Sequence, residues 1–174
     1  MDMVPHILLV DDNPAWQEAL AEYLRRKGFF VLEARDAASS LAVLERQPVT
    51  LIVCDYDLPG MNGLELVRLL RRLHHDAAVV MLSGEPDRSL AARALAAGAL
   101  GFIEKSAAPT VLLRKIRQLL DDARARHAAT RALPLWQRLL PNPYRHQRQP
   151  ARQARGQQVA RFLCKRVAQD PAAN

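Results

Sequence analysis

The sequence predicts an α/β, doubly wound fold with a five-stranded parallel sheet over about residues 1–120. Two observations lead to this prediction: five short aliphatic runs, and an amphipathic segment at helical spacing after each of them. Strand–helix alternation repeated in this way is typical of parallel sheets with right-handed crossovers. Helices on both faces of five strands favour the strand order 2-1-3-4-5.

The five apolar runs are too short and too continuously apolar for strands with one solvent face. They therefore predict strands that are buried on both faces, as in a parallel sheet. The runs are Ile7–Val10, Phe29–Leu32, Val49–Cys54, Ala78–Leu82 and Leu100–Ile103.

Helix signals follow each run. Asp36 is a predicted N-cap, Pro109 suits a first helical turn, and Gly28 and Gly98 stand where helices are expected to stop. With these helices the expected architecture is flavodoxin-like, and a ligand is expected outside the carboxyl ends of the strands. The predicted helices are Pro14–Lys27, Asp36–Gln47, Asn62–Leu73, Asp87–Ala97 and Pro109–Arg124.

Charge divides the chain near residue 123. Residues 1–123 hold 14 Lys/Arg and 17 Asp/Glu, whereas residues 124–174 hold 11 Lys/Arg and one acid, Asp170. The net charge of +7 therefore comes from the end of the chain. We predict one folded domain over residues 1–123 and a basic extension rich in Arg, Gln and Pro over residues 124–174, partly helical or disordered.

Targeting and cysteine signals are absent from the sequence. No apolar run approaches the roughly 18–20 residues that span a bilayer, and the first residues lack the pattern of a signal peptide. Cys54 and Cys164 have no close partner, so they form neither a metal motif nor a disulfide framework. We therefore expect a cytoplasmic protein without a transmembrane segment. Cys54 and Trp16 are interpreted as packing residues.

Polar residues stand at the carboxyl ends of four predicted strands, which should meet at one edge of the sheet. Clustered carboxylates repel one another, and Mg²⁺ relieves this repulsion. A carboxylate there could attack a phosphoryl donor while a lysine offsets the developing charge. Each residue alone suits a turn or a helix cap, and the joint pattern favours a site. The residues are Asp11 and Asp12 after the first strand, Asp55 and Asp57 at the third, Ser83 at the fourth and Lys105 at the fifth.

Four segments occur in a fixed order and spacing: Leu8–Asn13, Val53–Gly63, Met81–Gly84 and Gly101–Lys105. Together they resemble the defining segments of response-regulator receiver domains of two-component signalling, the CheY-like superfamily, over about residues 5–122. Ser106 stands where these receivers usually have proline. In this it resembles receivers of LuxR-type regulators, although residues 124–174 lack the length and pattern of their DNA-binding domain.

The resemblance implies a role for each matched residue. Phe102 has a plain core residue as its alternative interpretation, and the extra acid Asp57 could either orient or repel a hydrolytic water. The implied roles are Asp55 as phospho-acceptor, Asp12 and Asp11 as magnesium ligands with Asp55, the backbone carbonyl of Asp57 as a further ligand, Lys105 as the phosphate-pairing lysine, and Ser83 with Phe102 as the switch pair.

The implied function is a phosphorylation-dependent response regulator, with no enzymatic activity beyond the chemistry of its own phosphorylation. It would take phosphate from a histidine kinase or phosphotransfer protein and signal to a protein partner. The signalling face would comprise the segments predicted at 87–97, 100–103 and 109–124, and a homodimer is a further option.

Other functions stay open. One is a transcription or nucleic-acid-binding regulator that uses the basic extension as a reduced output module, and a weaker one is a scaffold without turnover. The extension itself suits a solvated tail, a docking or dimerisation segment, or an electrostatic contact with nucleic acid or a membrane, the last being less favoured.

Overall fold

A computed structural model describes residues 4–73, 77–84 and 88–132, with side chains up to residue 125. Five parallel strands form one sheet in the predicted order β2-β1-β3-β4-β5. The strands are β1 (His6–Val10), β2 (Phe30–Ala34), β3 (Leu51–Asp55), β4 (Ala78–Ser83) and β5 (Gly101–Glu104). The helices are α1 (Pro14–Arg26), α2 (Ala37–Arg46), α3 (Gly63–Arg72), α4 (Arg88–Ala97) and α5 (Pro109–Ala132).

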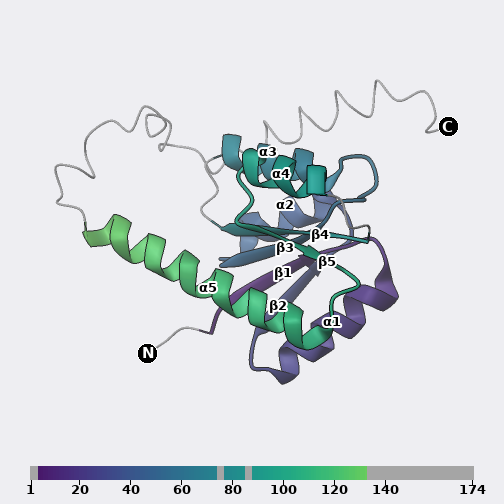
Figure 1. Ribbon diagram of the computed structural model, residues 1–174, viewed down its shortest axis with the longest axis horizontal. Helices are drawn as coiled ribbons and strands as arrows, with labels where there is room; N and C mark the ends of the chain where they lie inside the picture. Colours follow the sequence, from purple (N-terminus) through teal and green to yellow (C-terminus); the bar gives the residue numbers. More distant parts are fainter. Residues whose placement is uncertain (1–3, 74–76, 85–87, 133–174) are drawn as a thin grey trace. The chain divides into compact units, whose positions relative to one another are not determined.

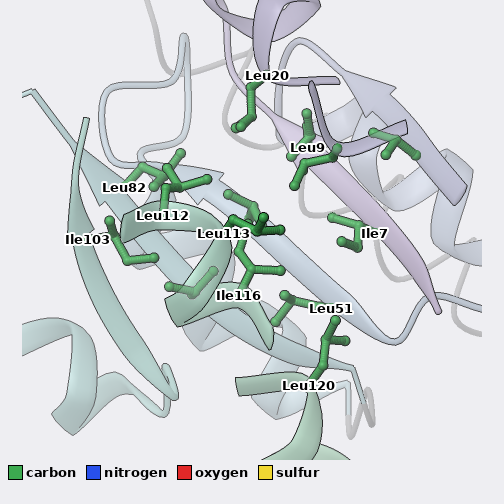
Figure 2. Close-up of a cluster of buried hydrophobic side chains, with 14 of the residues drawn as sticks. Ile7, Leu9, Leu20, Leu51, Leu82, Ile103, Leu112, Leu113, Ile116 and Leu120 are labelled. Carbon is green, nitrogen blue, oxygen red and sulfur yellow. The ribbon is translucent and has the colours of Figure 1, made fainter. Parts of the chain in front are cut away.

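Helices cover both faces of the sheet (Figure 1), with α1 and α5 on one face and α2, α3 and α4 on the other. The core between the sheet and the first pair is aliphatic. Figure 2 shows Leu112, Leu113 and Ile116 of α5 reaching toward Leu9 and Leu82 of the sheet. Burial of apolar surface between the sheet and these two helices holds the strands in place, and the loops that carry the site extend from the ends of these strands.

The central strands are buried on both faces as predicted, but the prediction was wrong for the two edge strands. Every residue of β3 and β4 is buried, whereas Phe30 of β2 is exposed, and Leu32 of β2 and Phe102 of β5 are partly exposed. An edge strand has a neighbour on one side only, so its outer margin faces solvent.

The predicted strand Phe29–Leu32 is observed as Phe30–Ala34, and the end of α1 explains its later start. Gly28 has φ +89°, and the amides of Gly28 and Phe29 donate to Arg25 O at 3.0 Å and to Leu24 O at 3.2 Å. These bonds close the last turn of the helix and keep Phe29 out of the strand. The predicted strand Val49–Cys54 begins as β3 at Leu51, and the Thr50 amide just before it already donates to His6 O of β1 at 2.9 Å.

The predicted helix caps are confirmed. The Asp36 side chain accepts a hydrogen bond from the Ser39 amide at 2.6 Å, and α5 begins at Pro109. Helix α5 continues past Arg124 to Ala132, while the predicted start of α4 at Asp87 and the part of the 124–174 extension after Ala132 lie outside the described residues. Within the described ranges, none of the helices combines the length and apolar character that crossing a bilayer requires.

Candidate functional site

The structure brings the predicted acids together at the carboxyl ends of β1 and β3. Asp11 and Asp55 are buried and Asp12 is exposed, and each offers a carboxylate oxygen within 4.8 Å of the other two. These two strands are neighbours in the sheet, with Val10 opposite Cys54. Because Asp11 and Asp55 come directly after this pair, the register of β1 and β3 places the two acids next to each other.

Lys105 lies between the two buried acids. Its Nζ is 2.7 Å from Asp11 Oδ2 and 3.0 Å from Asp55 Oδ2. The Lys105 backbone amide donates to Ser83 O at 2.8 Å, so its main chain is bound to the end of β4. Only 19 % of the side chain is exposed, which strengthens both ion pairs relative to pairs in water.

Local hydrogen bonds fix the two carboxylates. The Asn13 amide donates to Asp11 Oδ1 at 2.9 Å, and the Tyr56 amide donates to Asp55 Oδ1 at 2.9 Å. Each carboxylate thus has one oxygen held by the main chain and the other turned toward Lys105. Within the described residues, Asp11 Oδ2 is buried without a well-formed hydrogen bond, and the Lys105 ion pair alone meets its charge.

Gly63 allows α3 to begin against the backbone of Asp55. A Cβ at this position would lie 2.1 Å from Asp55 O and 3.1 Å from Cys54 Sγ. The Gly63 amide donates to Tyr56 O at 2.8 Å, and Asn62 caps the helix in a capping box with Glu65. Glycine is required here because the helix approaches the strand end too closely for any side chain.

Comparison with known proteins identifies the family. The family model for the response regulator receiver domain matches residues 7–117. The chain belongs to the response-regulator receiver family. This confirms the resemblance found in the sequence and agrees with the five-stranded order of the sheet.

Solved receivers share the fold. A CheY-like response regulator receiver domain protein from Methanospirillum hungatei JF-1 superposes with a TM-score of 0.67 at 31 % identity, covering 71 % of this chain and 99 % of that one. NtrX from Brucella abortus gives a TM-score of 0.69 at 30 % identity, covering 76 % of this chain and 31 % of that one.

Similar curated proteins are transcriptional regulators. The transcriptional activator protein ExaE of Pseudomonas putida is 39 % identical over 116 residues, which is 66 % of this chain and 54 % of that protein. The transcriptional regulatory protein AruR of Pseudomonas aeruginosa is 35 % identical over 144 residues, 80 % of this chain and 58 % of that protein. The chain thus spans about half the length of these relatives.

Burial shapes the electrostatics of the receiver site. It raises the pKa of the Asp55 carboxyl, and the charge of Asp11 adds to this rise while Lys105 opposes it. Burial alone would lower the pKa of Lys105, but its contacts with Asp11 and Asp55 outweigh burial and raise it. The lysine is therefore a firmly held cation, which is the partner that two buried carboxylates need.

The donor set fits a magnesium ion. Three carboxylates share one edge of the sheet, and the buried Asp11 Oδ2 still lacks a well-formed hydrogen bond in the described part of the chain. Carboxylate oxygens are the ligands that Mg²⁺ prefers in proteins.

The other predicted site residues lie on β4, on β5 and in the loop after β3. Ser83 is buried at the end of β4, and Asp57 is exposed in the loop after β3. Phe102 is partly exposed on β5, and so differs from the buried core residue of its alternative interpretation. Cys54 is fully buried, as predicted, and burial strongly raises the pKa of its thiol.

Trp16 was interpreted from the sequence as a packing residue only. It does pack against the core, but its ring also lies at the site, with Lys105 Nζ 5.0 Å from the ring centroid. The sequence signal that could have located it is its place in the first turn of the helix after Asp12, at the sheet edge that carries the acids.

Proposed function

We propose that this receiver is a phosphorylation switch in which Asp55 accepts a phosphoryl group from a histidine kinase or phosphotransfer protein in the cytoplasm. One observation carries the proposal: the Lys105 ammonium group lies at 3.0 Å from a buried Asp55 oxygen. A cation held at that place can offset charge on a group that becomes attached to the same oxygen.

The transfer uses groups of this chain at defined atoms. An oxygen of the Asp55 carboxylate forms the new bond to phosphorus as the phosphorus–nitrogen bond to the donor histidine breaks. The donor imidazole keeps the bonding electron pair and takes up a proton from solvent. Lys105 neutralises charge on the transferring oxygens, and the Tyr56 amide keeps Asp55 Oδ1 in place.

Asp11, Asp12 and Asp55, with the backbone carbonyl of Asp57, are the groups that would hold Mg²⁺. When bound, the cation supplies positive charge beside the acceptor, where two buried carboxylates otherwise share one lysine.

The signal leaves the site through β4 and β5 in this proposal. A phosphoryl group adds about 1.5 to 2 negative charges and strong hydrogen-bond acceptors at Asp55. The Ser83 hydroxyl is drawn toward these oxygens, and the partly exposed Phe102 moves into the space that Ser83 leaves. The result is a population shift of the α4–β5–α5 face, which binds a protein partner or a second copy of the chain.

A second candidate function is transcriptional regulation through nucleic acid. The similarity to transcriptional regulators and the excess of Lys/Arg over residues 124–174 favour it. In that case DNA binding should weaken steeply with salt and disappear when residues 125–174 are removed.

The test is uptake of phosphate from acetyl phosphate, followed by intact-protein mass. Wild type should gain one phosphoryl group with magnesium and none without it, and Asp55→Asn should gain none. Asp121→Asn, which changes an exposed carboxylate on α5, is the matched control and should behave as wild type. Failure of correctly folded wild type to take up phosphate would leave a receiver scaffold as the better description.

A further inference from the structure

We propose that Trp16 is a positioning residue for Lys105. The Trp16 ring keeps the Lys105 ammonium group at Asp55 during phosphoryl transfer. The inference rests on the proposed function and adds a residue to its machinery. The contacts of Lys105 Nζ carry it: the Trp16 ring centroid lies at 5.0 Å, Asp11 Oδ2 at 2.7 Å and Asp55 Oδ2 at 3.0 Å. The ammonium group is thus held between two carboxylates and an aromatic face.

Hydrogen bonds through Asn13 link the backbone of Trp16 to Asp11, one of the two acids that Lys105 contacts. The Trp16 backbone amide donates to Asn13 Oδ1 at 3.1 Å, and the Asn13 amide donates in turn to Asp11 Oδ1 at 2.9 Å. Pro14 begins the helix, and the Trp16 ring packs against the core beneath α1. The ring therefore keeps a fixed position relative to the carboxylate that Lys105 contacts.

An aromatic face suits the change that phosphoryl transfer imposes on Lys105. The ammonium group must leave a carboxylate oxygen for a phosphoryl oxygen, and its four-carbon chain has many rotamers. A ring attracts a cation over its whole face and does not select one oxygen. Trp16 can hold the ammonium group both before and after this exchange of partners.

A purely structural role for Trp16 makes different predictions, and the same helix offers the control. Tyr23 also packs against the core beneath α1 and also has a lysine over its ring, Lys27 Nζ at 5.6 Å from the centroid. Among the described residues, Asp11 and Asp55 form their ion pairs with Lys105 and none with Lys27. Tyr23→Leu therefore removes packing and a cation–π contact without touching Lys105.

The first measurement is the rate of phosphate uptake from acetyl phosphate with magnesium. Trp16→Leu should lower this rate by about twofold to thirtyfold, the range of one cation–π contact. Trp16→Phe, which keeps an aromatic face, should recover most of the rate, and Tyr23→Leu should match wild type. Equal rates for Trp16→Leu and wild type, or equal losses for the Leu and Phe variants, would overturn the proposal.

The second measurement does not depend on phosphate. Limited acetylation with acetic anhydride, read by peptide mass spectrometry, gives the reactivity of the Lys105 amine relative to the exposed Lys115 of the same chain. Trp16→Leu should raise this ratio, because the amine becomes more mobile and more exposed, whereas Trp16→Phe and Tyr23→Leu should not. An unchanged ratio in Trp16→Leu would show that the ring does not hold Lys105. If wild type takes up no phosphate, the proposed function fails, and the ratio alone then decides whether Trp16 holds Lys105.

Discussion

The close approach of α3 to Asp55 at the end of β3 gives the sharpest test of how the site is built, through the substitution Gly63→Ala. The added Cβ would lie 2.1 Å from Asp55 O, so the two atoms must separate by roughly 1.3 Å or more to reach an ordinary contact distance. The obstacle is backbone, which cannot rotate away. The Gly63 amide, now 2.8 Å from Tyr56 O, would then lie beyond hydrogen-bonding distance.

Two costs follow from that displacement. Overpacking of a tight site costs about 1–3 kcal/mol, and loss of a hydrogen bond adds about 0.5–1.5 kcal/mol. We therefore expect Gly63→Ala to lower the free energy of unfolding by about 1.5–4.5 kcal/mol. Phosphate uptake should fall as well, because the backbone of Asp55 must yield.

The assay is urea unfolding followed by circular dichroism, with Gly84→Ala as the matched control. A Cβ at Gly84 would meet nothing within 4 Å, so this variant should unfold close to wild type. The reasoning is refuted if the two variants have equal stability within about 0.5 kcal/mol, the ordinary range for a surface substitution.

Three further predictions concern the same region. Magnesium at ten times its dissociation constant should stabilise the folded receiver by about 1.4 kcal/mol in a thermal melt. Asp11→Asn should lose most of this stabilisation and Asp121→Asn should keep it; equal gains in both variants would place the ion elsewhere. Burial raises the pKa of Cys54 above its ordinary value of 9.0, so the folded state keeps a proton that the unfolded state releases. Stability should therefore fall as pH rises above about 9, by up to about 1.4 kcal/mol per pH unit for one proton, and parallel pH curves for wild type and Cys54→Ala would contradict this sign. Gln17 is buried, and its side-chain amide donates to Ala34 O at 2.7 Å and Leu9 O at 3.3 Å. Gln17→Met should cost about 1–3 kcal/mol in urea unfolding, since two buried carbonyls lose a donor, and a cost below about 0.5 kcal/mol would show that water replaces it.

The sequence was sufficient for the strand order and for the meeting of the acids. The strand order depends on the periodicity of apolar residues, and the meeting of the acids depends on parallel strands having their carboxyl ends at the same edge of the sheet. Asp11, Asp55 and Lys105 follow three different strands and are in contact, as this rule predicts. The start of β2 was not predictable in the same way, because the hydrogen bonds after Gly28 decide it and not the hydropathy of Phe29.

The contact between Trp16 and Lys105 escaped prediction for a different reason. An aromatic residue at helical spacing fits a core position, and Trp16 does pack against the core. Its contact with Lys105 joins the first turn of α1 to the residue after β5, which helical spacing alone does not indicate, and only its place after Asp12 at the acidic edge of the sheet points to it. Exposure of the outer parts of β2 and β5 likewise depends on where the sheet ends.

The loop after β3 is held by its main chain. The Tyr56 amide donates to Leu82 O at 2.9 Å, and Tyr56 O accepts from the Gly63 amide at 2.8 Å. The side chains of Tyr56 and Asp57 play no part in these bonds; Tyr56 is partly exposed and Asp57 is exposed. Replacing them should leave Asp55 in its place while altering how water reaches it. In the proposed phosphorylation switch, the lifetime of the phosphorylated state is thus open to adjustment, by selection or by a protein engineer, at two side chains on which the loop backbone does not depend.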